Sequence, residues 1–235
     1  MSQLFLPRSM EPVYGYNPFS DCPLFRDLSV KQLFELRRCG TQIELGADEP
    51  IFDQFSPCTS VFNVISGAIV VERFADDGRR QIIGFLFPGD YLGIVNSARY
   101  EVAARSLTKS TLYRFGRKKL VDFSLHNHQL RRNIEHIMSN VFYRLMEQLF
   151  ILGQKKAHER LCFLFVHLLE RMPGATPEHI QLYMSRQDIA DYLGLTIETV
   201  SRSLAKLKTD GLIHFPSINH LQILNVPAVR KLAAT

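Results

Sequence analysis

The sequence predicts an α+β chain: an N-terminal antiparallel β-roll or jelly-roll barrel, one long helix, and a C-terminal winged helix-turn-helix. Three observations predict this order. Short apolar runs separated by turn residues fill the first half of the 235-residue chain. One apolar stripe with helical spacing then covers residues 130–152. Near the C-terminus, residues 185–208 carry the capping, small, glycine and valine positions of two helices that cross at a fixed angle.

The bulk composition permits several classes and excludes a few. Apolar residues make up 46% of the chain, and the net charge of +5 permits nucleic-acid binding without demanding it. No apolar stretch approaches the roughly 18 residues of a membrane span, and no signal-peptide layout begins the chain. We therefore expect a cytoplasmic protein that does not bind membranes. The four cysteines form no CxxC pair, so neither a metal site nor a disulfide framework is predicted.

The first half of the chain predicts a barrel preceded by a flexible arm. Residues 1–19 hold three prolines and no periodic pattern, which is typical of an arm. Within residues 20–125, short β-branched and aromatic runs occupy 61–65, 68–74 and 81–87. Turn signals separate these runs at Ser66-Gly67, Asp76-Asp77-Gly78 and Pro88-Gly89-Asp90. Short strands at this spacing favour an antiparallel barrel over a parallel sheet.

Residues 126–154 predict a long dimerisation helix that ends in a hinge. Its apolar stripe is Leu130, Ile134, Ile137, Val141, Leu145, Leu149 and Leu152. A seam of this length suits a two-stranded coiled coil, and hence a homodimer. The alternative is a helix packed on its own barrel, and Met138, Phe142 and Met146 widen the stripe enough for both roles. The polar break at 153–156 is the candidate hinge.

Residues 155–235 predict a separate small domain. A helical run from Ala157 to Arg171 opens it, and Pro173-Gly174 ends that run. Near the other end, residues 212–215 and 220–224 flank a turn at Pro216 to Asn219, which predicts a hairpin wing.

Between these elements lies the helix-turn-helix pattern. Ser185 with Asp188 three residues later signals a helix start. Ala190 stands where two helices cross closely, and Gly194 can take the left-handed conformation that ends the first helix. Thr196 then caps a second helix, whose buried face is Val200, Leu204 and Leu207.

The opposite face of that second helix carries candidate contacts to double-stranded DNA. Glu198, Ser201 and Arg202 lie where a recognition helix reaches base edges in the major groove. Arginine is the best donor to guanine, and glutamate can accept from cytosine. An ordinary Glu–Arg pair on a solvated face, worth about 0.3 kcal/mol, is the alternative. The candidate contacts to the DNA backbone are Thr196, Thr199, Lys206 and Lys208.

A barrel, a long helix and a winged helix-turn-helix with Glu198-x-x-Ser201-Arg202, in that order, resemble the Crp/Fnr superfamily of bacterial regulators. The resemblance covers roughly residues 20–225 and is strongest over 189–213; within the superfamily, the helix-turn-helix looks most like the FixK branch. It implies a transcription activator that works with RNA polymerase, in low-oxygen and nitrogen-metabolism gene control. In this superfamily the Glu-x-x-Ser-Arg pattern goes with TTGA-type half-sites, which implies an inverted repeat close to TTGA-N6-TCAA.

The resemblance also implies where a cyclic nucleotide would bind, and this chain departs from that pattern. Ile94 stands where cAMP-binding members have a ribose-binding Glu. The phosphate-binding Arg-Ser position falls near Tyr100-Glu101, and the pair Arg105-Ser106 comes about five residues late. A buried phosphate without a fixed cation is costly, so we expect no cAMP.

Other ligands and other classes of protein are disfavoured for similar reasons. Only Cys22 precedes Cys39, whereas oxygen-sensing members hold an iron–sulfur cluster with a tight N-terminal cysteine group. No spacing singles out His126, His128 or His136 as a haem ligand. We therefore expect no cofactor; an effector-dependent sensor of the same fold, responding to a cyclic nucleotide or haem, is the alternative. A cyclic-nucleotide module acting on an enzyme or channel would lack the helix-turn-helix, and no catalytic motif predicts an enzyme.

Overall fold

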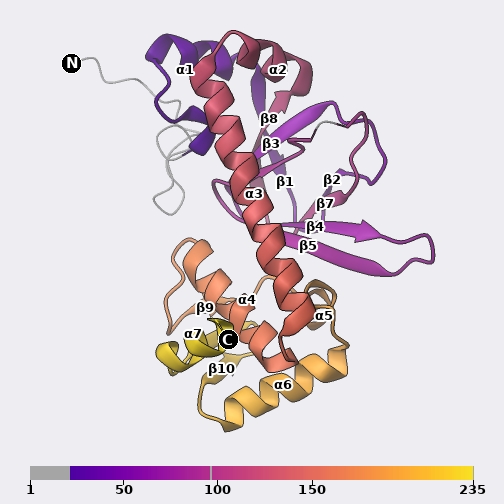
Figure 1. Cartoon of the computed structure of the whole chain (residues 1–235), viewed down its shortest axis with the longest axis vertical. Helices are drawn as coiled ribbons and strands as arrows, with labels where there is room; N and C mark the ends of the chain where they lie inside the picture. The colour runs from indigo at the N-terminus through magenta and orange to yellow at the C-terminus, as the bar shows by residue number, and fades with distance from the viewer. Residues whose placement is uncertain (1–21, 96, 235) are drawn as a thin grey trace. The chain divides into compact units, whose positions relative to one another are not determined.

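The computed structural model describes residues 22–95 and 97–234 (Figure 1). The arm expected at residues 1–19 lies outside the described residues. The chain divides into two compact units. Of the described residues, one unit comprises 22–69, 86–95 and 97–142, and the other comprises 70–85 and 143–234. The predicted domain limits at 125 and 154 stay a prediction.

Two four-stranded sheets form the predicted β-roll. The first has the order β1 (Gly40–Leu45), β8 (Ser110–Gly116), β3 (Ser60–Ser66) and β6 (Tyr91–Leu92), with antiparallel neighbours. The second has the order β2 (Pro50–Phe52), β7 (Ala103–Ser106), β4 (Ile69–Phe74) and β5 (Arg80–Leu86). The three predicted runs became β3, β4 and β5. Gly67, between β3 and β4, has a φ of 87°, and a Cβ there would lie 2.7 Å from the Lys109 carbonyl oxygen.

Two helices of the first unit were not predicted. They are α1 (Val30–Arg37) and α2 (Arg117–Leu125), and a short 3₁₀ helix, η2 (Pro23–Phe25), precedes them. Ser29 begins α1 with a capping box, in which the Ser29 N–H donates to Gln32 Oε1 at 2.8 Å and Ser29 Oγ accepts from the Gln32 N–H. The expectation of strands alone was wrong here because helices of about two turns carry little periodicity.

The core of the first unit joins the barrel, α1, α2 and the beginning of α3 (His128–Gln154). Buried side chains from all four parts pack in one cluster, which includes Leu36, Val61, Phe115, Leu120, Leu130 and Ile137. Ile134 packs against this cluster. The apolar stripe of α3 therefore contacts the chain's own core over its N-terminal half, which is one of the two roles that the widened stripe allows.

Among its described residues, the second unit contains the β4–β5 hairpin, the C-terminal part of α3, four further helices and a small sheet. The helices that follow α3 are α4 (Ala157–Arg171), α5 (Arg186–Leu193), α6 (Ile197–Thr209) and α7 (Val226–Ala234). The sheet has the order β10 (Ile213–Ser217), β11 (His220–Ile223) and β9 (Ile180–Gln181). Cys162 on α4 is fully buried, and burial raises the pKa of its thiol to about 12. Cys162 is therefore a core thiol.

The wing is present, but its turn is shorter than predicted. β10 runs through Pro216 to Ser217, so only Ile218 and Asn219 separate it from β11. The pairing register shifts between His214 and Ser217. Proline has no N–H to give to the ladder, and a local irregularity accommodates it.

The break between α3 and α4 is held by hydrogen bonds. α3 ends at Gln154 and α4 begins at Ala157. The Arg160 guanidinium donates to the carbonyl oxygens of Leu152, Lys155 and Leu193 at 2.8, 2.9 and 2.8 Å. The buried Lys155 ammonium donates to the Ala233 carbonyl at 2.6 Å. That this break acts as a hinge stays a prediction.

Candidate nucleic-acid interface

The first helix of the predicted motif, α5, begins at a full capping box. Ser185 Oγ accepts from the Asp188 N–H at 3.0 Å, and the Ser185 N–H and hydroxyl donate to Asp188 Oδ2 at 2.9 and 2.7 Å. Burial alone would raise the pKa of Asp188, but hydrogen bonds from Ser185 and from the Arg80 guanidinium hold it below its ordinary value. Asp188 is therefore a buried carboxylate that stays ionised.

The turn after α5 depends on glycine. Gly194 has φ 60° and ψ 44°, the left-handed conformation, and its N–H donates to the Ala190 carbonyl. A side chain at this position would be strained by the positive φ. Ala190 is fully buried. Both positions are as the sequence predicted.

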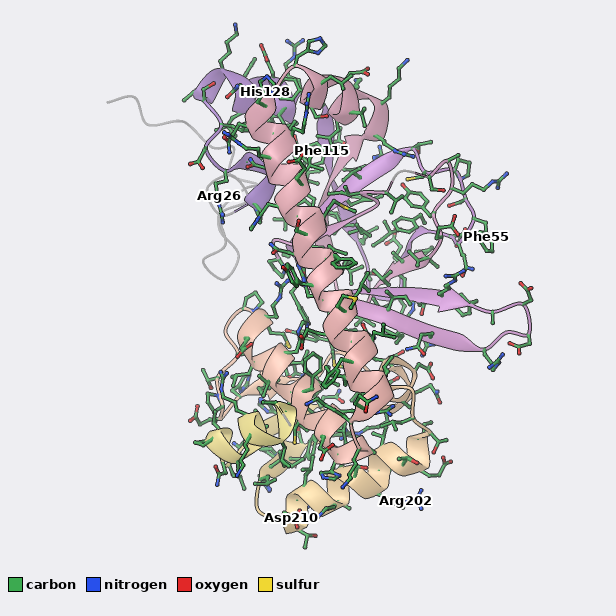
Figure 2. The ribbon with its side chains drawn as sticks, in the orientation of Figure 1. Arg26, Phe55, Phe115, His128, Arg202 and Asp210 are labelled. Carbon is green, nitrogen blue, oxygen red and sulfur yellow. The ribbon has the colours of Figure 1, made fainter. Side chains whose placement is uncertain are left out.

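The second helix, α6, buries one face and exposes the other. Thr196 caps it by accepting from the Thr199 N–H at 3.2 Å. The buried residues are Val200, Ser203, Leu204 and Leu207, which include the whole predicted inner face. Glu198, Ser201 and Arg202 are exposed, and Figure 2 shows Arg202 on the outer side of this helix. Since 3.6 residues make a turn, the inward apolar spacing aims these three polar side chains outward.

The charged groups on this face act separately. Arg202 Nη2 donates to Thr199 Oγ1 at 3.4 Å, and among the described residues Arg202 and Glu198 form no ion pair. Hydrogen bonds from its own backbone N–H and from Thr196 hold the pKa of Glu198 below its ordinary value, and the charge of Arg202 adds to this. A permanent donor and a permanent acceptor are thus both available to an external partner.

The predicted backbone contacts differ in their surroundings. Lys208 is exposed, as is Thr196, while Thr199 is half-buried. Lys206 Nζ lies 2.8 Å from Asp210 Oδ2, in an exposed ion pair between residues one helical turn apart. Such a pair is worth little in water, so Lys206 can exchange Asp210 for a phosphate.

Arg186, the first residue of α5, was not predicted from the sequence because a lone arginine after a cap carries no distinctive spacing. Its guanidinium lies 4.8 Å from the ring centroid of Phe215 on β10. Its Nη1 is buried and has no hydrogen-bond partner among the described residues, and burial lowers its pKa. Arg186 joins α5 to the wing, and its position beside a helix N-terminus marks it as a further candidate for a phosphate contact.

In the barrel, Tyr100 packs among aromatic side chains; its sequence position is the one near which the family resemblance implies a phosphate-binding Arg-Ser pair. The Tyr100 ring stacks on Phe52, with centroids 3.8 Å apart and planes inclined by 12°, and Phe52 in turn lies 5.9 Å from Phe62. The Tyr100 hydroxyl donates to the Ser60 carbonyl at 2.7 Å. Burial raises the pKa of Tyr100 to about 12, so this side chain is a neutral, fixed part of the core.

The nearby Arg105-Ser106 pair holds the connection between β1 and β2. Arg105 Nη1 lies 2.7 Å from Asp48 Oδ1. The buried Ser106 hydroxyl donates to the Gly46 carbonyl at 2.6 Å and accepts from the Glu49 N–H at 2.9 Å. Both side chains therefore have structural partners.

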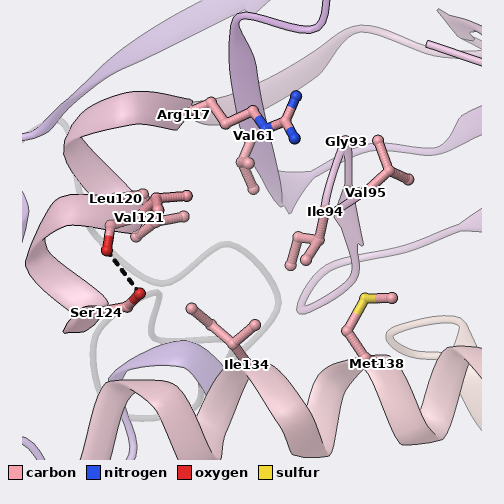
Figure 3. A pocket seen from close by; sticks show the side chains of 10 residues that line it. All are labelled: Val61, Gly93, Ile94, Val95, Arg117, Leu120, Val121, Ser124, Ile134 and Met138. Atoms are coloured by element: carbon pink, nitrogen blue, oxygen red, sulfur yellow. Dashed lines mark hydrogen bonds between the residues drawn. The ribbon is translucent and has the colours of Figure 1, made fainter. Parts of the chain in front are cut away.

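A cavity of about 270 Å³ lies in the first unit between the barrel, α2 and α3 (Figure 3). Its lining is mainly aliphatic: Val61, Gly93, Ile94, Val95, Arg117, Leu120, Val121, Ser124, Ile134 and Met138. Arg117 Nη1 donates to the carbonyl oxygens of Cys58 and Ser97. His126, His128 and His136 are exposed and do not line this cavity. Within residues 22–95 and 97–234, no group of three or more His, Cys, Asp or Glu could hold a metal ion.

No helix in the described part of the chain combines the length and apolar character needed to cross a bilayer.

This fold and this exposed helix face define a transcription regulator of the helix-turn-helix class. The family model for the cyclic nucleotide-binding domain matches residues 42–127, and that for bacterial regulatory proteins of the crp family matches residues 182–213. The nitrogen fixation regulation protein FixK of Bradyrhizobium diazoefficiens is 34% identical over 225 residues, with 92% of this chain and 93% of that protein covered. The transcriptional activatory protein AadR of Rhodopseudomonas palustris is 35% identical, with 76% of each covered.

Among solved structures, FixK2 from Bradyrhizobium japonicum matches with a TM-score of 0.78 at 30% identity, covering 83% of this chain and 98% of that one. The chain belongs to the Crp/Fnr family of bacterial transcription regulators. Its relatives and its fold are those of regulators and not of enzymes.

Proposed function

We propose that the chain is a homodimeric transcription activator that reads an inverted repeat close to TTGA-N6-TCAA and needs no small-molecule effector. The observation that carries the proposal is the outer face of α6, where Glu198, Ser201 and Arg202 are exposed while Val200, Leu204 and Leu207 anchor the helix. Relatives named as nitrogen fixation regulators and as an activatory protein support activation and a role in low-oxygen or nitrogen-metabolism gene control.

Base reading follows from the chemistry of this face. Arg202 donates to guanine O6 and N7, and Glu198 accepts from cytosine N4. One G·C pair in each half-site is read across both strands in this way. Thr196, Thr199, Lys206 and Lys208 hold the DNA backbone and set the register, as phosphate contacts do.

Dimerisation uses the exposed apolar face of α3. Leu145 and Leu149 from the predicted seam are 45% and 64% exposed, whereas Leu130 and Ile137 pack in the chain's own core. The exposed set is completed by Met138, Phe142, Met146 and Phe150. Two copies paired along this face would bury it and bring two recognition helices to half-sites about 34 Å apart.

The aromatic packing in the barrel supports independence from an effector. The Tyr100 ring lies on Phe52, and Arg105 is paired with Asp48. A ligand regulates only through different affinities for two states, and a buried phosphate without a cation of its own would be costly. Gene control then comes from the amount of protein, with RNA polymerase as the partner of the DNA-bound dimer.

The test is selection from a randomised DNA library with purified protein and no added ligand. Enrichment of TTGA-N6-TCAA supports the proposal. Enrichment of GTGA half-sites contradicts the base assignment, and binding that requires cAMP contradicts the effector-free mode.

A further inference from the structure

The β4–β5 hairpin holds α5 through one arginine. Residues 70–85 lie inside the stretch that matches the cyclic nucleotide-binding domain, yet they belong to the same compact unit as the helix-turn-helix. Arg80 on β5 donates from Nε to Asp191 Oδ2 and from Nη2 to Asp188 Oδ1, both at 2.7 Å. Its Nη1 donates to Glu72 Oε2 on β4 at 3.2 Å.

This cluster is shielded from water. The Arg80 side chain is 21% exposed, and those of Glu72, Asp188 and Asp191 are 7%, 8% and 14% exposed. Burial alone would lower the pKa of Arg80, but the hydrogen bonds to Asp191 and Asp188 raise it. Removing the guanidinium would leave three carboxylates close together and poorly solvated, a much larger penalty than the loss of a surface pair.

Two other residues of β5 add contacts to the same helix. The Gln81 amide donates to the Asp191 carbonyl at 2.6 Å and to the Tyr192 carbonyl at 3.4 Å. Carbonyl groups in the last turn of a helix lack partners within it, so Gln81 supplies a missing donor. The Phe85 ring lies 5.1 Å from the Tyr192 ring.

The contacts reach both ends of α5. Asp188 uses one carboxylate oxygen to cap the helix through Ser185 and the other to bind Arg80. Asp191 likewise binds Arg80 with one oxygen and accepts from Gln187 with the other. The hairpin therefore fixes the position of α5 at its first and last turns. None of these contacts uses Glu198, Ser201 or Arg202, so the outer face of α6 stays open while the hairpin is attached.

We propose that the β4–β5 hairpin is a clamp on the helix-turn-helix, with Arg80 as its positioning residue, and that the clamped arrangement is the one that binds DNA. The inference rests on the proposed function for its DNA readout. With the clamp intact, α5 is already ordered when DNA arrives. Without it, binding has to restore that order, and affinity falls.

The experiment compares Arg80→Gln with Arg79→Gln in the full chain. Both variants remove one positive charge from the same hairpin, but Arg79 lies in an exposed ion pair with Asp77, with side chains 83% and 56% exposed. Affinity for the selected DNA site is expected to fall about tenfold or more in Arg80→Gln and to change less than about twofold in Arg79→Gln. Hydrogen exchange of the α5 amides, measured without DNA, is expected to quicken in Arg80→Gln only.

Gln81→Ala keeps the experiment decisive if Arg80→Gln does not fold. It removes the amide that binds the end of α5 without stranding any buried charge, and it should quicken α5 exchange and weaken DNA binding to a smaller degree.

Equal affinity and equal exchange in the Arg79 and Arg80 variants would overturn the clamp, and so would tighter DNA binding in Arg80→Gln. Failure of the unmodified protein to bind any selected DNA would instead overturn the proposed function, and the exchange measurement would still report on the clamp.

Discussion

Replacing Arg202 by Ala should weaken discrimination at the G·C pair of each half-site and leave folding nearly unchanged. The side chain is exposed, and its contact in the free protein is a 3.4 Å hydrogen bond to Thr199. An exposed substitution of this kind changes the free energy of unfolding by less than about 0.5 kcal/mol. A bidentate arginine–guanine contact contributes about 1–3 kcal/mol of discrimination, so preference for G·C at that position should fall by roughly five- to 150-fold.

The assay is fluorescence anisotropy with the selected palindrome and with versions substituted at the G·C pair of each half-site. The matched control is Lys208→Ala, which also removes one exposed positive charge from α6. It should weaken all sequences nearly equally and lower the slope of log affinity against log salt by about 1. If Arg202→Ala weakens every sequence equally and the G·C preference survives, Arg202 contacts the backbone and the base assignment is refuted.

Three further outcomes are expected. Leu145→Glu and Leu149→Glu should shift the chain to monomer in sedimentation, and an unchanged dimer in both variants would refute the α3 interface. Ile137→Glu should instead lower the melting temperature, because Ile137 is a core residue. Purified protein should bind its site without cAMP and show no visible absorbance, and a tenfold gain in affinity on adding cAMP would contradict this. The pKa of Asp188 is held below its ordinary value of 3.8, so the stability that its ionised form contributes is complete above that value and is lost as the pH falls through the depressed pKa. On acidification the unmodified protein should therefore lose more of its neutral-pH free energy of unfolding than Asp188→Asn does. Parallel losses in the two proteins would refute this role.

The helix-turn-helix could be predicted almost completely because its determinants are local. Ser185 and Asp188 are three residues apart, and Gly194 acts through its own backbone angle. The inward spacing of Val200, Leu204 and Leu207 determines the outer face of α6 without any knowledge of the remaining fold. The wing turn was misplaced by two residues because a proline in an edge strand resembles a turn signal.

Other features depend on partners distant in the chain. The stripe on α3 predicts a buried face, but spacing does not say whether the barrel or a second copy covers it; Leu130 and Ile137 proved to face the barrel core. Arg80 is 108 residues from Asp188 and 111 from Asp191. No local pattern in β5 distinguishes this arginine from its neighbour Arg79.

The proline in the wing has a consequence for how the protein behaves at high concentration. β10 is an edge strand of its sheet, and an unpaired edge is a template for strands of other molecules. Pro216 offers no N–H there, and the shifted register between His214 and Ser217 disrupts the regular spacing of the remaining groups. The wing can therefore extend into solvent without offering a regular edge to a strand from another copy.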